Sequence, residues 1–373
     1  MRERLPAAYI KELLKKNETP FMAVNTEAAV SRYRAFRKAL PGVEVFYSVK
    51  ANPDPEIIKA LLKEGASFDA ASAGEIGMLS ELCVPSERMI YANTVKPVSH
   101  IKEARKAGVQ IMTFDNEQEL RKIADNYPGA SVMLRIKVTN LGSVIELSRK
   151  FGAEPERSLA LLKTAAEFGL CPFGVSFHVG SQCTDIRTYS TALEISSEIF
   201  KEAEAEEIKL EMLDIGGGFP IRHFDNDTHP TLRGLSDLIR KELKRLFKPG
   251  IRIIAEPGRF IAGPSCTLAA GVIGKTVRND MNYYYLDDGI YGDFSGVVFD
   301  QCKYEYRSFK RGQKYSSVLA GPSCDSFDTV AVGVMLPELD VGDVVYVRNI
   351  GAYSCATAVD GFNGFRPARK VYV

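Results

Sequence analysis

The sequence lacks both an excess of charge of one sign and any long hydrophobic run. Lys plus Arg number 48 and Asp plus Glu number 47 in 373 residues, with no run of like charge. This balance favours neither nucleic acid nor an anionic membrane surface as a partner. No stretch approaches the ~18 consecutive apolar residues of a spanning helix. The opening residues MRERLPAAYIKELLKKN lack the apolar core of a secretion signal. We therefore expect a cytoplasmic protein that binds a small molecule.

Paired cysteines are also absent. The seven cysteines stand singly in the sequence, and no C-x-x-C pair or cluster of His and Cys occurs. Disulfides and a structural metal are therefore not expected. Hydrophobic residues at 45% and charged residues at 25% are typical of an ordinary globular protein with a substantial core.

From about residue 43 to 258, short β-rich runs alternate with longer segments of helical periodicity. Eight strands are predicted, at residues 43–49, 66–71, 89–93, 110–115, 131–138, 173–179, 210–216 and 251–257. Helical stretches between them include residues 55–65, 74–82, 118–126, 157–169 and 235–247. Eight strands alternating with helices over this length predict a (β/α)₈ barrel.

After about residue 263 the pattern becomes strand after strand, separated by Gly, Asp and Asn. Predicted strands include TLAAGVIGKTVR, MNYYYLDD, GVVFD, YSSVLAGP, VGDVVYVRNIG and ARKVYV. This pattern indicates an antiparallel β domain, and the early segment PFMAVN (20–25) is expected to pair with it. The predicted domains are a barrel at 27–263 and a β domain formed by 1–26 plus 264–373.

Polar residues close the predicted barrel strands, at the end where barrels of this kind form active sites. They are Lys50, Asp69, Asn93, Asp115, Arg135, His178, Gly216 to Gly218, and Glu256 followed by Pro257, Gly258 and Arg259. Each residue alone is more often a solvated loop residue. Together they form a coherent set of candidate site residues.

The glycine run and the Gly258-Arg259 pair offer backbone N–H groups and a guanidinium to a phosphate. A lysine in the same set suggests a carbonyl cofactor held as an imine. Pyridoxal phosphate (PLP) has both groups, and Glu256 is a suitable partner for its ring nitrogen. His178 is either an ordinary core or rim histidine or an imidazole stacked on the cofactor ring, with Ser181 near the phosphate.

Eight ordered motifs carry a resemblance to a known family. They are FYSVKANP, FDAASAGEI, GVSFHVGSQ, LDIGGGFP, AEPGRF, LDDGIYGDFSGVVFD, GPSCDSFD and GAYSCATAVDGFNGF. Nearly end to end, the sequence resembles the fold-type III PLP-dependent decarboxylases of ornithine, lysine, arginine and diaminopimelate, and bacterial lysine/ornithine decarboxylases most of all. The resemblance implies an alanine racemase-like fold, with a barrel followed by a β domain. It also implies a homodimer whose active sites each lie between the barrel of one subunit and the β domain of the other.

The resemblance also implies roles for individual residues. Lys50 would hold the cofactor as a Schiff base, His178 would stack on its ring, and Glu256 would face the ring nitrogen. Further cofactor contacts would come from Asp69, Arg135, Ser181, Gly217, Gly218, Gly258, Arg259 and Tyr353. Cys324 would protonate the carbon that loses CO₂, although a lone cysteine is by default a small buried hydrophobe. Its Gly-Pro and Asp neighbours favour the catalytic interpretation.

Two carboxylates narrow the set of candidate substrates. Asp300 and Asp325 would face a distal cation, and two carboxylates suit an ammonium group. The resembling diaminopimelate enzymes carry Glu-Ser-Gly where this chain has Cys-Asp-Ser, and arginine-selective relatives have a longer acid in place of Asp300. Phe362 would line the site, in a loop one residue longer than in some relatives. Ornithine is the preferred substrate and lysine the alternative, because one methylene changes binding by only ~1–3 kcal/mol.

Three other classes of protein compete with this interpretation. A catalytically inactive regulatory relative would lose cofactor residues, but Lys50, His178, Glu256, Arg259 and Cys324 are all present. A racemase or PLP carrier on the same barrel would lack the Cys-Asp motif. A specialised decarboxylase of a modified amino acid, in a siderophore or other secondary-metabolite pathway, stays open as an alternative.

Overall fold

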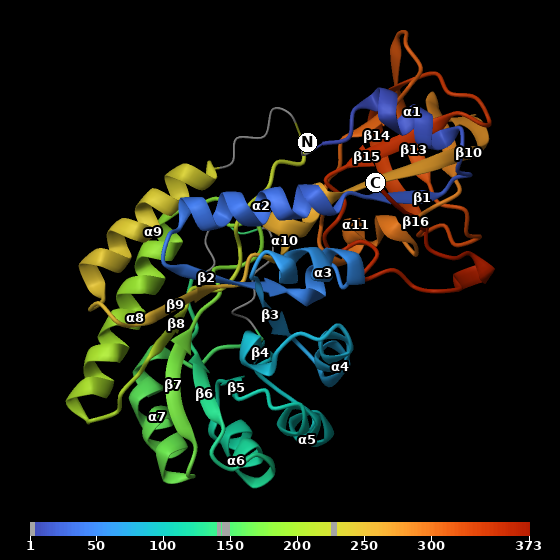
Figure 1. The fold of residues 1–373 in the computed structure, drawn as a ribbon. Coiled ribbons are helices and arrows are strands. Elements are labelled where there is room, and N and C mark those ends of the chain that lie inside the picture. The colour runs from blue at the N-terminus through green and yellow to red at the C-terminus, as the bar shows by residue number, and fades with distance from the viewer. Residues whose placement is uncertain (1–3, 140–142, 144–149, 225–229) are drawn as a thin grey trace. The chain divides into compact units, whose positions relative to one another are not determined.

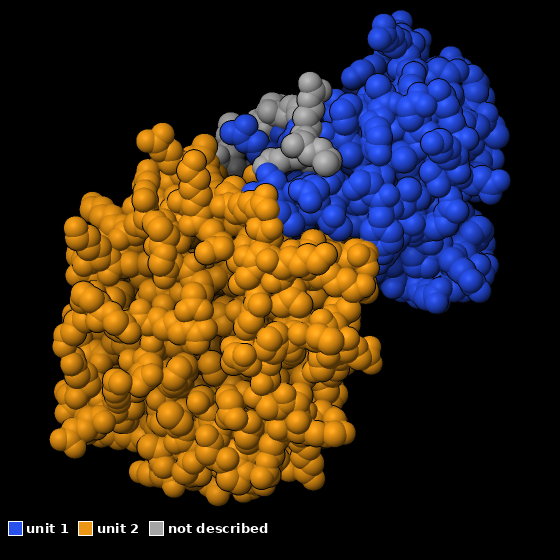
Figure 2. Space-filling view, in the orientation of Figure 1, with its two compact units in different colours: residues 1–31, 221–228, 259–373 blue, residues 32–220, 229–258 orange. Residues whose placement is uncertain are grey.

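The computed structural model describes residues 4–139, 143, 150–224 and 230–373. Contacts divide the chain into two compact units, coloured separately in Figure 2. Unit 1 contains Met1–Ser31, Ile221–Thr228 and Arg259–Val373, and unit 2 contains Arg32–Pro220 and His229–Gly258. The division differs from the predicted domains by a few residues at each boundary and by the segment 221–228, which groups with unit 1.

Unit 2 is a closed barrel of eight strands, β2 to β9, in which every neighbouring pair is parallel (Figure 1). The strands are β2 (Val43–Ser48), β3 (Ser67–Ala70), β4 (Met89–Tyr91), β5 (Ile111–Phe114), β6 (Ser131–Arg135), β7 (Cys171–Ser176), β8 (Met212–Asp214) and β9 (Arg252–Ala255). All eight predicted strands are confirmed, each shorter than predicted because several terminal residues belong to the loops.

The barrel closes around side chains from several strands. Phe46, Ile90, Met133, Met212 and Ile254 form one fully buried cluster. The first four come from β2, β4, β6 and β8, as expected for a barrel whose interior layers are filled from alternate strands. The barrel interior at this level is therefore packed.

Helices follow the strands around the outside of the barrel (Figure 1). They are α3 (Pro55–Lys63), α4 (Ala73–Glu81), α5 (Val98–Lys106), α6 (Glu117–Asn126), α7 (Ser158–Glu167), α8 (Arg187–Ala205) and α9 (Leu232–Leu246), with α2 (Thr26–Ala39) preceding β2 and α10 (Gly258–Ala262) following β9. Asp54, Ser72, Asn116 and Thr231 cap four of them by accepting N–H bonds in the first turn. These caps fix where α3, α4, α6 and α9 begin after the preceding strands. Among the described residues, no helix has the length and apolarity needed to cross a bilayer.

Unit 1 contains an eight-stranded sheet with the path β12-β15-β10-β11-β13-β14, to which β1 and β16 are joined through β10. Its elements are α1 (Ala7–Leu14), β1 (Phe21–Val24), β10 (Cys266–Arg278), β11 (Met281–Leu286), α11 (Gly296–Phe299), β12 (Tyr306–Ser308), β13 (Lys314–Ala320), β14 (Thr329–Pro337), β15 (Val344–Arg348) and β16 (Arg369–Tyr372). The expected pairing of PFMAVN is confirmed, because β1 pairs with both β10 and β16.

Two expectations for this unit need correction. The sheet is mixed rather than purely antiparallel, since β11 pairs with β13 and β1 pairs with β16 in parallel. The segment GVVFD, predicted as a strand from its valines, forms the short helix α11 after the 3-10 turn η5 (Asp293–Ser295). Hydrogen bonds from the backbone N–H groups of Asp300 and Cys302 to the Gly296 carbonyl close this turn, which overrides the weak β propensity.

The β7–β8 contact gives a test of barrel packing. Gly174 pairs with Met212, and a Cβ at Gly174 would lie 2.2 Å from the Met212 carbonyl oxygen. We expect Gly174→Ala to lower the free energy of unfolding by about 1–3 kcal/mol, because neither backbone can move freely. Gly77, in α4, has open space at its Cβ position and is the matched control. Gly77→Ala should be neutral or stabilising by up to about 1 kcal/mol in denaturant unfolding followed by circular dichroism. Equal midpoints for Gly174→Ala and wild type would contradict the close contact.

Candidate active site

Lys50 lies immediately after β2, in the 3-10 turn η1 (Val49–Ala51). Its Nζ donates a hydrogen bond to Asp69 Oδ2 at 2.7 Å, and Asp69 lies in the neighbouring strand β3. The Lys50 side chain is 42% exposed, whereas that of Asp69 is fully buried. The other oxygen, Asp69 Oδ1, is buried with no hydrogen-bond partner among the described residues. A solvent-accessible amine is thus paired with a buried carboxylate.

The glycine run Gly216 to Gly218 follows β8 and forms a closely packed turn. Gly216 and Gly218 have φ values of +65° and +97°, which side chains other than glycine rarely adopt. A Cβ at Gly217 would lie 3.0 Å from His178 Nε2 and 2.9 Å from the Glu256 carbonyl oxygen. The Tyr189 hydroxyl donates to the Gly217 carbonyl at 2.7 Å and fixes the turn. The neighbouring protein atoms leave no room for a side chain at any of the three positions, so the chain can turn beside His178 and Glu256 only because these residues are glycines.

His178 faces this turn in one defined protonation state. Its Nδ1 accepts a hydrogen bond from the Gly180 N–H at 3.0 Å, so the ring proton is on Nε2, the atom nearest Gly217. Burial, and then the positive charges of Arg135 and Lys50, hold the pKa of His178 well below its usual range. The imidazole is consequently neutral at physiological pH and offers an uncharged aromatic face.

Asp214, at the end of β8, and Glu256, just after β9, form a buried carboxyl pair. Their exposed fractions are 1% and 7%. Burial raises the pKa of Asp214 to about 7 and raises that of Glu256 well above its ordinary value. The Asp214 charge raises the pKa of Glu256 further, whereas a hydrogen bond with Glu256 lowers the pKa of Asp214. Glu256 Oε1 is buried and has no hydrogen-bond partner among the described residues. The pair therefore carries at least one proton at neutral pH and presents an unused oxygen.

Other residues at the strand ends have structural contacts. Asn93 donates to the Ala71 carbonyl at 3.2 Å, and Asp115 accepts from the Gly152 N–H at 2.9 Å. Both residues thus hold neighbouring loops. The Arg135 guanidinium lies 5.5 Å from the centre of the Phe151 ring, and its charge acts on both Asp214 and Glu256.

Ser181 and Gly258 complete the predicted barrel residues. Ser181 follows His178 in the loop after β7. A Cβ at Gly258 would lie 2.8 Å from the Ala51 Cβ and 3.0 Å from the Ser48 Cβ, so the start of α10 can approach the end of β2 only with glycine at this position. The structure thus gathers the predicted residues of unit 2 at the carboxyl ends of β2, β3, β6, β7, β8 and β9.

In unit 1, Arg259 is the centre of a buried cluster. Its guanidinium forms a salt bridge with Asp300 and lies 4.8 Å from the centre of the Tyr353 ring. The Cys302 thiol donates to Asp300 Oδ2 at 3.1 Å, and Arg259 donates to Cys302 Sγ at 3.4 Å. Burial first, and then Asp300, raise the pKa of Cys302 to about 11, so this thiol stays protonated. The Asp300 carboxylate therefore already binds a cation and a thiol.

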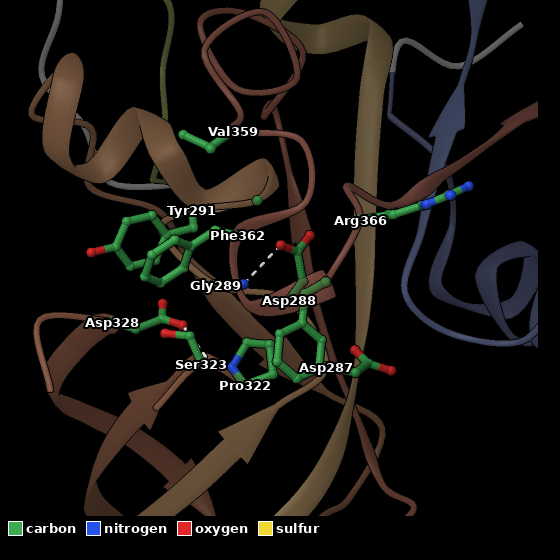
Figure 3. A pocket seen from close by; sticks show the side chains of 12 residues that line it. Asp287, Asp288, Gly289, Tyr291, Pro322, Ser323, Asp328, Val359, Phe362 and Arg366 are labelled. Carbon is green, nitrogen blue, oxygen red and sulfur yellow. Dashed lines mark hydrogen bonds between the residues drawn. The ribbon is translucent and has the colours of Figure 1, made fainter. Parts of the chain in front are cut away.

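Three other predicted residues of unit 1 meet around Tyr291, beside the pocket drawn in Figure 3. The Tyr291 ring stacks on Phe362, with ring centres 4.0 Å apart, and its hydroxyl donates to Asp325. Cys324, next to Asp325, is exposed and hydrogen-bonded to Asn363. The two loops that carry these residues are therefore joined by side-chain contacts.

Sequence reasoning missed four residues of these clusters. Asp214, Tyr291 and Asn363 lie inside motifs that were recognised, LDIGGGFP, LDDGIYGDF and GFNGF. The sequence shows these residue types, but it does not show which residues they contact. Cys302 lies outside every motif, so no signal in the sequence pointed to it. Among the residues that the structure describes, no cluster of His, Cys, Asp and Glu side chains could hold a metal ion.

The residues of unit 2 fit PLP. The Lys50 amine is accessible, and Glu256 has a buried oxygen without a hydrogen-bond partner among the described residues, which suits a protonated ring nitrogen. The neutral His178 ring suits contact with an aromatic cofactor. Fold and site together define a PLP-dependent enzyme built on a parallel barrel with a second, β-rich unit.

Comparison with known proteins gives the family. Residues 27–263 match the model of the pyridoxal-dependent decarboxylase pyridoxal-binding domain. The lysine/ornithine decarboxylase of Selenomonas ruminantium is 41% identical over 97% of this chain and 91% of that protein. The chain belongs to the fold-type III PLP-dependent decarboxylases.

Solved structures agree with this assignment. A structure of the Selenomonas ruminantium lysine decarboxylase in complex with PLP and cadaverine superposes with a TM-score of 0.93 at 40% identity, covering 99% of this chain and 94% of that one. A lysine/ornithine decarboxylase from Vibrio vulnificus complexed with putrescine gives 0.91 at 35% identity, covering 99% of both chains. The protein is a PLP-dependent carboxy-lyase that acts on a basic amino acid.

The buried carboxyl pair predicts a pH-dependent stability of the cofactor-free protein. The folded-state pKa of Asp214, about 7, exceeds its unfolded value, so its stabilising contribution is complete below the unfolded pKa and is lost as the pH rises through about 7. Asp214→Asn keeps an acceptor for the Gly216 N–H, which binds Asp214 Oδ1 at 2.8 Å, but cannot ionise. We expect the thermal midpoint of Asp214→Asn minus that of wild type to increase as the pH rises from ~5 to ~8. Asp125→Asn, at an exposed position, is the control for loss of one carboxyl. A constant difference between Asp214→Asn and wild type across this range would exclude the buried charge.

Proposed function

We propose that the chain decarboxylates L-ornithine to putrescine, with L-lysine to cadaverine as an alternative or second reaction. The observation that carries the substrate class is the Asp300 carboxylate of unit 1, which is buried and already binds a cation, Arg259. Asp325 supplies a second carboxylate. Relatives with putrescine or cadaverine bound, and one named lysine/ornithine decarboxylase, support a diamine product.

The proposed cofactor contacts follow the geometry of unit 2. PLP, when bound, supplies an aldehyde that reacts with amines and a ring that accepts the electrons of the broken C–C bond. Lys50 would hold it covalently, and Asp69 would orient the Lys50 side chain through the hydrogen bond between them. Glu256 would bind the ring nitrogen, and the neutral His178 would stack on the ring without opposing its positive charge.

The phosphate would be held by neutral donors and one guanidinium. These residues are Ser181, Gly218, Gly258, Arg259 and Tyr353, and Arg135 and Gly217 would make further contacts with the cofactor. Since Arg259 now binds Asp300, a phosphate would compete with that carboxylate for the guanidinium. Asp300 would then be available to the distal ammonium of the substrate, with Asp325 as its partner and Phe362 beside the carbon chain. The Cys324 thiol would give its proton to the carbon that loses CO₂.

We also propose a homodimer that shares its active sites. The cofactor domain would span 27–263, and the second domain, 1–26 plus 264–373, would contribute to the interface. Cys324 is exposed in the single chain, although it would have to meet the substrate. Phe327, Val332 and Met335 nearby in sequence are 61%, 66% and 53% exposed, an apolar surface that a second copy would cover. A cytoplasmic location is proposed as well, and the seven free cysteines agree with a reducing compartment.

Amine production by the purified, PLP-loaded protein tests the substrate. The panel is L-ornithine, L-lysine, L-arginine and meso-diaminopimelate, and the amines are separated by chromatography. We expect putrescine as main product and cadaverine within about 10–200-fold in kcat/KM, since one methylene separates the substrates. Agmatine as the main product would contradict the assignment, and silence across the panel with cofactor bound would point to a modified amino acid.

Replacing the proposed cofactor lysine tests the site. Lys50→Ala should abolish the absorbance band of covalently bound PLP and reduce amine formation to background, because no other amine is paired with Asp69 in the described structure. Lys59→Ala is the control, since Lys59 is an exposed lysine of the adjacent helix α3 that pairs only with Glu56 among the described contacts. An unchanged absorbance band in Lys50→Ala would show that another residue binds the cofactor.

A further inference from the structure

Asn363 makes two hydrogen bonds to Cys324. Its Oδ1 lies 3.1 Å from the Cys324 backbone nitrogen and 3.3 Å from Cys324 Sγ. A backbone N–H can only donate, so the atom of Asn363 that faces it must be the oxygen and not the amide nitrogen. The thiol, which meets the same oxygen, therefore donates its S–H. The contact fixes both the position and the proton of the thiol.

The loop that presents Asn363 is held in place independently of Cys324. Asn363 has φ +50°, between Gly361 at φ +86° and Gly364 at φ +81°, so the turn is left-handed at three of its four residues. Phe362, the residue before Asn363, stacks on Tyr291, whose hydroxyl binds Asp325, the residue after Cys324 (Figure 3). Tyr291 thus joins the Asn363 loop and the Cys324 loop at neighbouring positions.

The Cys324 loop has a second anchor. Asp328 is buried, and its two carboxylate oxygens accept N–H bonds from Ile290 at 2.9 Å and from Ser323 at 3.1 Å. A Cβ at Gly321 would lie 2.2 Å from Asp328 Oδ1, so the chain passes close to this carboxylate. Cys324 is therefore fixed from the Ser323 side by Asp328 and from the solvent side by Asn363.

We propose that Asn363 is a positioning residue that holds the Cys324 thiol and directs its S–H. This inference rests on the proposed role of Cys324. In that role the S–H proton moves to the carbon that has lost CO₂, the S–H electron pair stays on sulfur, and the resulting thiolate regains a proton from water. An amide oxygen can only accept a hydrogen bond, so Asn363 holds the thiol through the proton that Cys324 would transfer.

Asn363 could otherwise serve only its turn, because asparagine adopts left-handed backbone angles more readily than most residues. Two substitutions separate these roles. Asn363→Gly keeps the backbone conformation and removes the acceptor. Asn363→Asp keeps an acceptor for the thiol and adds a negative charge that disfavours a thiolate beside it.

The first measurement is the rate of alkylation of Cys324 by iodoacetamide at neutral pH in the PLP-loaded protein, read by peptide mass spectrometry. Exposed Cys83 is the internal control for reagent, and buried Cys266 reports loss of fold. Loss of one hydrogen bond should raise the Cys324 rate about three- to ten-fold in Asn363→Gly, while Asn363→Asp should stay at or below the wild-type rate. Cys83 and Cys266 should be unchanged in both variants.

The second measurement is the ratio of amine to carbonyl product. When the proton goes to the cofactor carbon instead, the amino group stays on the cofactor and the substrate leaves as CO₂ plus an aldehyde. We expect more aldehyde from Asn363→Gly, and a wild-type ratio from Asn363→Asp. Alkylation of Cys324 at the wild-type rate in Asn363→Gly would overturn the proposal, as would equal aldehyde increases in both variants.

Cys324→Ala separates this inference from the proposed function. If Cys324→Ala gives the wild-type product ratio, Cys324 is not the proton donor, and the product ratio no longer tests Asn363. The alkylation rate of Cys324 still decides whether Asn363 holds the thiol. If Cys324→Ala yields aldehyde but Asn363→Gly does not, the role of Cys324 stands and that of Asn363 is refuted. Should labelling of Cys266 show that Asn363→Gly unfolds, Asn363→Ala replaces it in both measurements.

Discussion

Closure of the barrel is the constraint on which the site depends. β2 and β9 pair in parallel through Val43↔Ile253 and Val45↔Ala255, although about two hundred residues separate them in sequence. This pairing brings the residues after the two strands together, and the Ser48 hydroxyl donates to the Glu256 carbonyl at 3.1 Å. Lys50 and Glu256 therefore face the same end of the barrel because the sheet has no free edge.

The carboxyl groups at this end of the barrel outnumber the cations that act on them. Asp69, Asp214 and Glu256 are buried there, and the cations that act on them are Lys50 and Arg135. Burying carboxyl groups without full pairing is unfavourable, and the excess is relieved by protonation. A cofactor with a protonated ring nitrogen would relieve it as well, so the electrostatics of these buried carboxyl groups favour such a ligand.

The loops of unit 1 follow a different principle. Arg259, Asp300 and Cys302 satisfy one another in a buried cluster, while Tyr291, Asp325, Cys324 and Asn363 are linked by contacts near the surface. In the buried cluster a guanidinium and a carboxylate bind each other. In the surface group, stacking and hydrogen bonds hold the exposed Cys324 thiol. Unit 1 therefore contains both a buried ion pair and a thiol held near the surface.

The sequence by itself determined the eight barrel strands, because apolar runs of the right length separated by amphipathic helices have few other ways to bury their surface. It also determined the identity of residues such as Lys50, His178 and Glu256, which stand where strands end. Only the tertiary structure decided which of these residues meet. The contact of Asn363 with Cys324, the raised pKa values of Asp214 and Glu256, and the thiol of Cys302 on Asp300 all involve partners far apart in sequence or depend on burial. The failure at GVVFD has the same cause, since a local preference for strand was outweighed by the turn that the surrounding loops impose. Periodicity reports how a segment buries its own side chains, whereas the chemistry of a site depends on the neighbours that chain closure supplies.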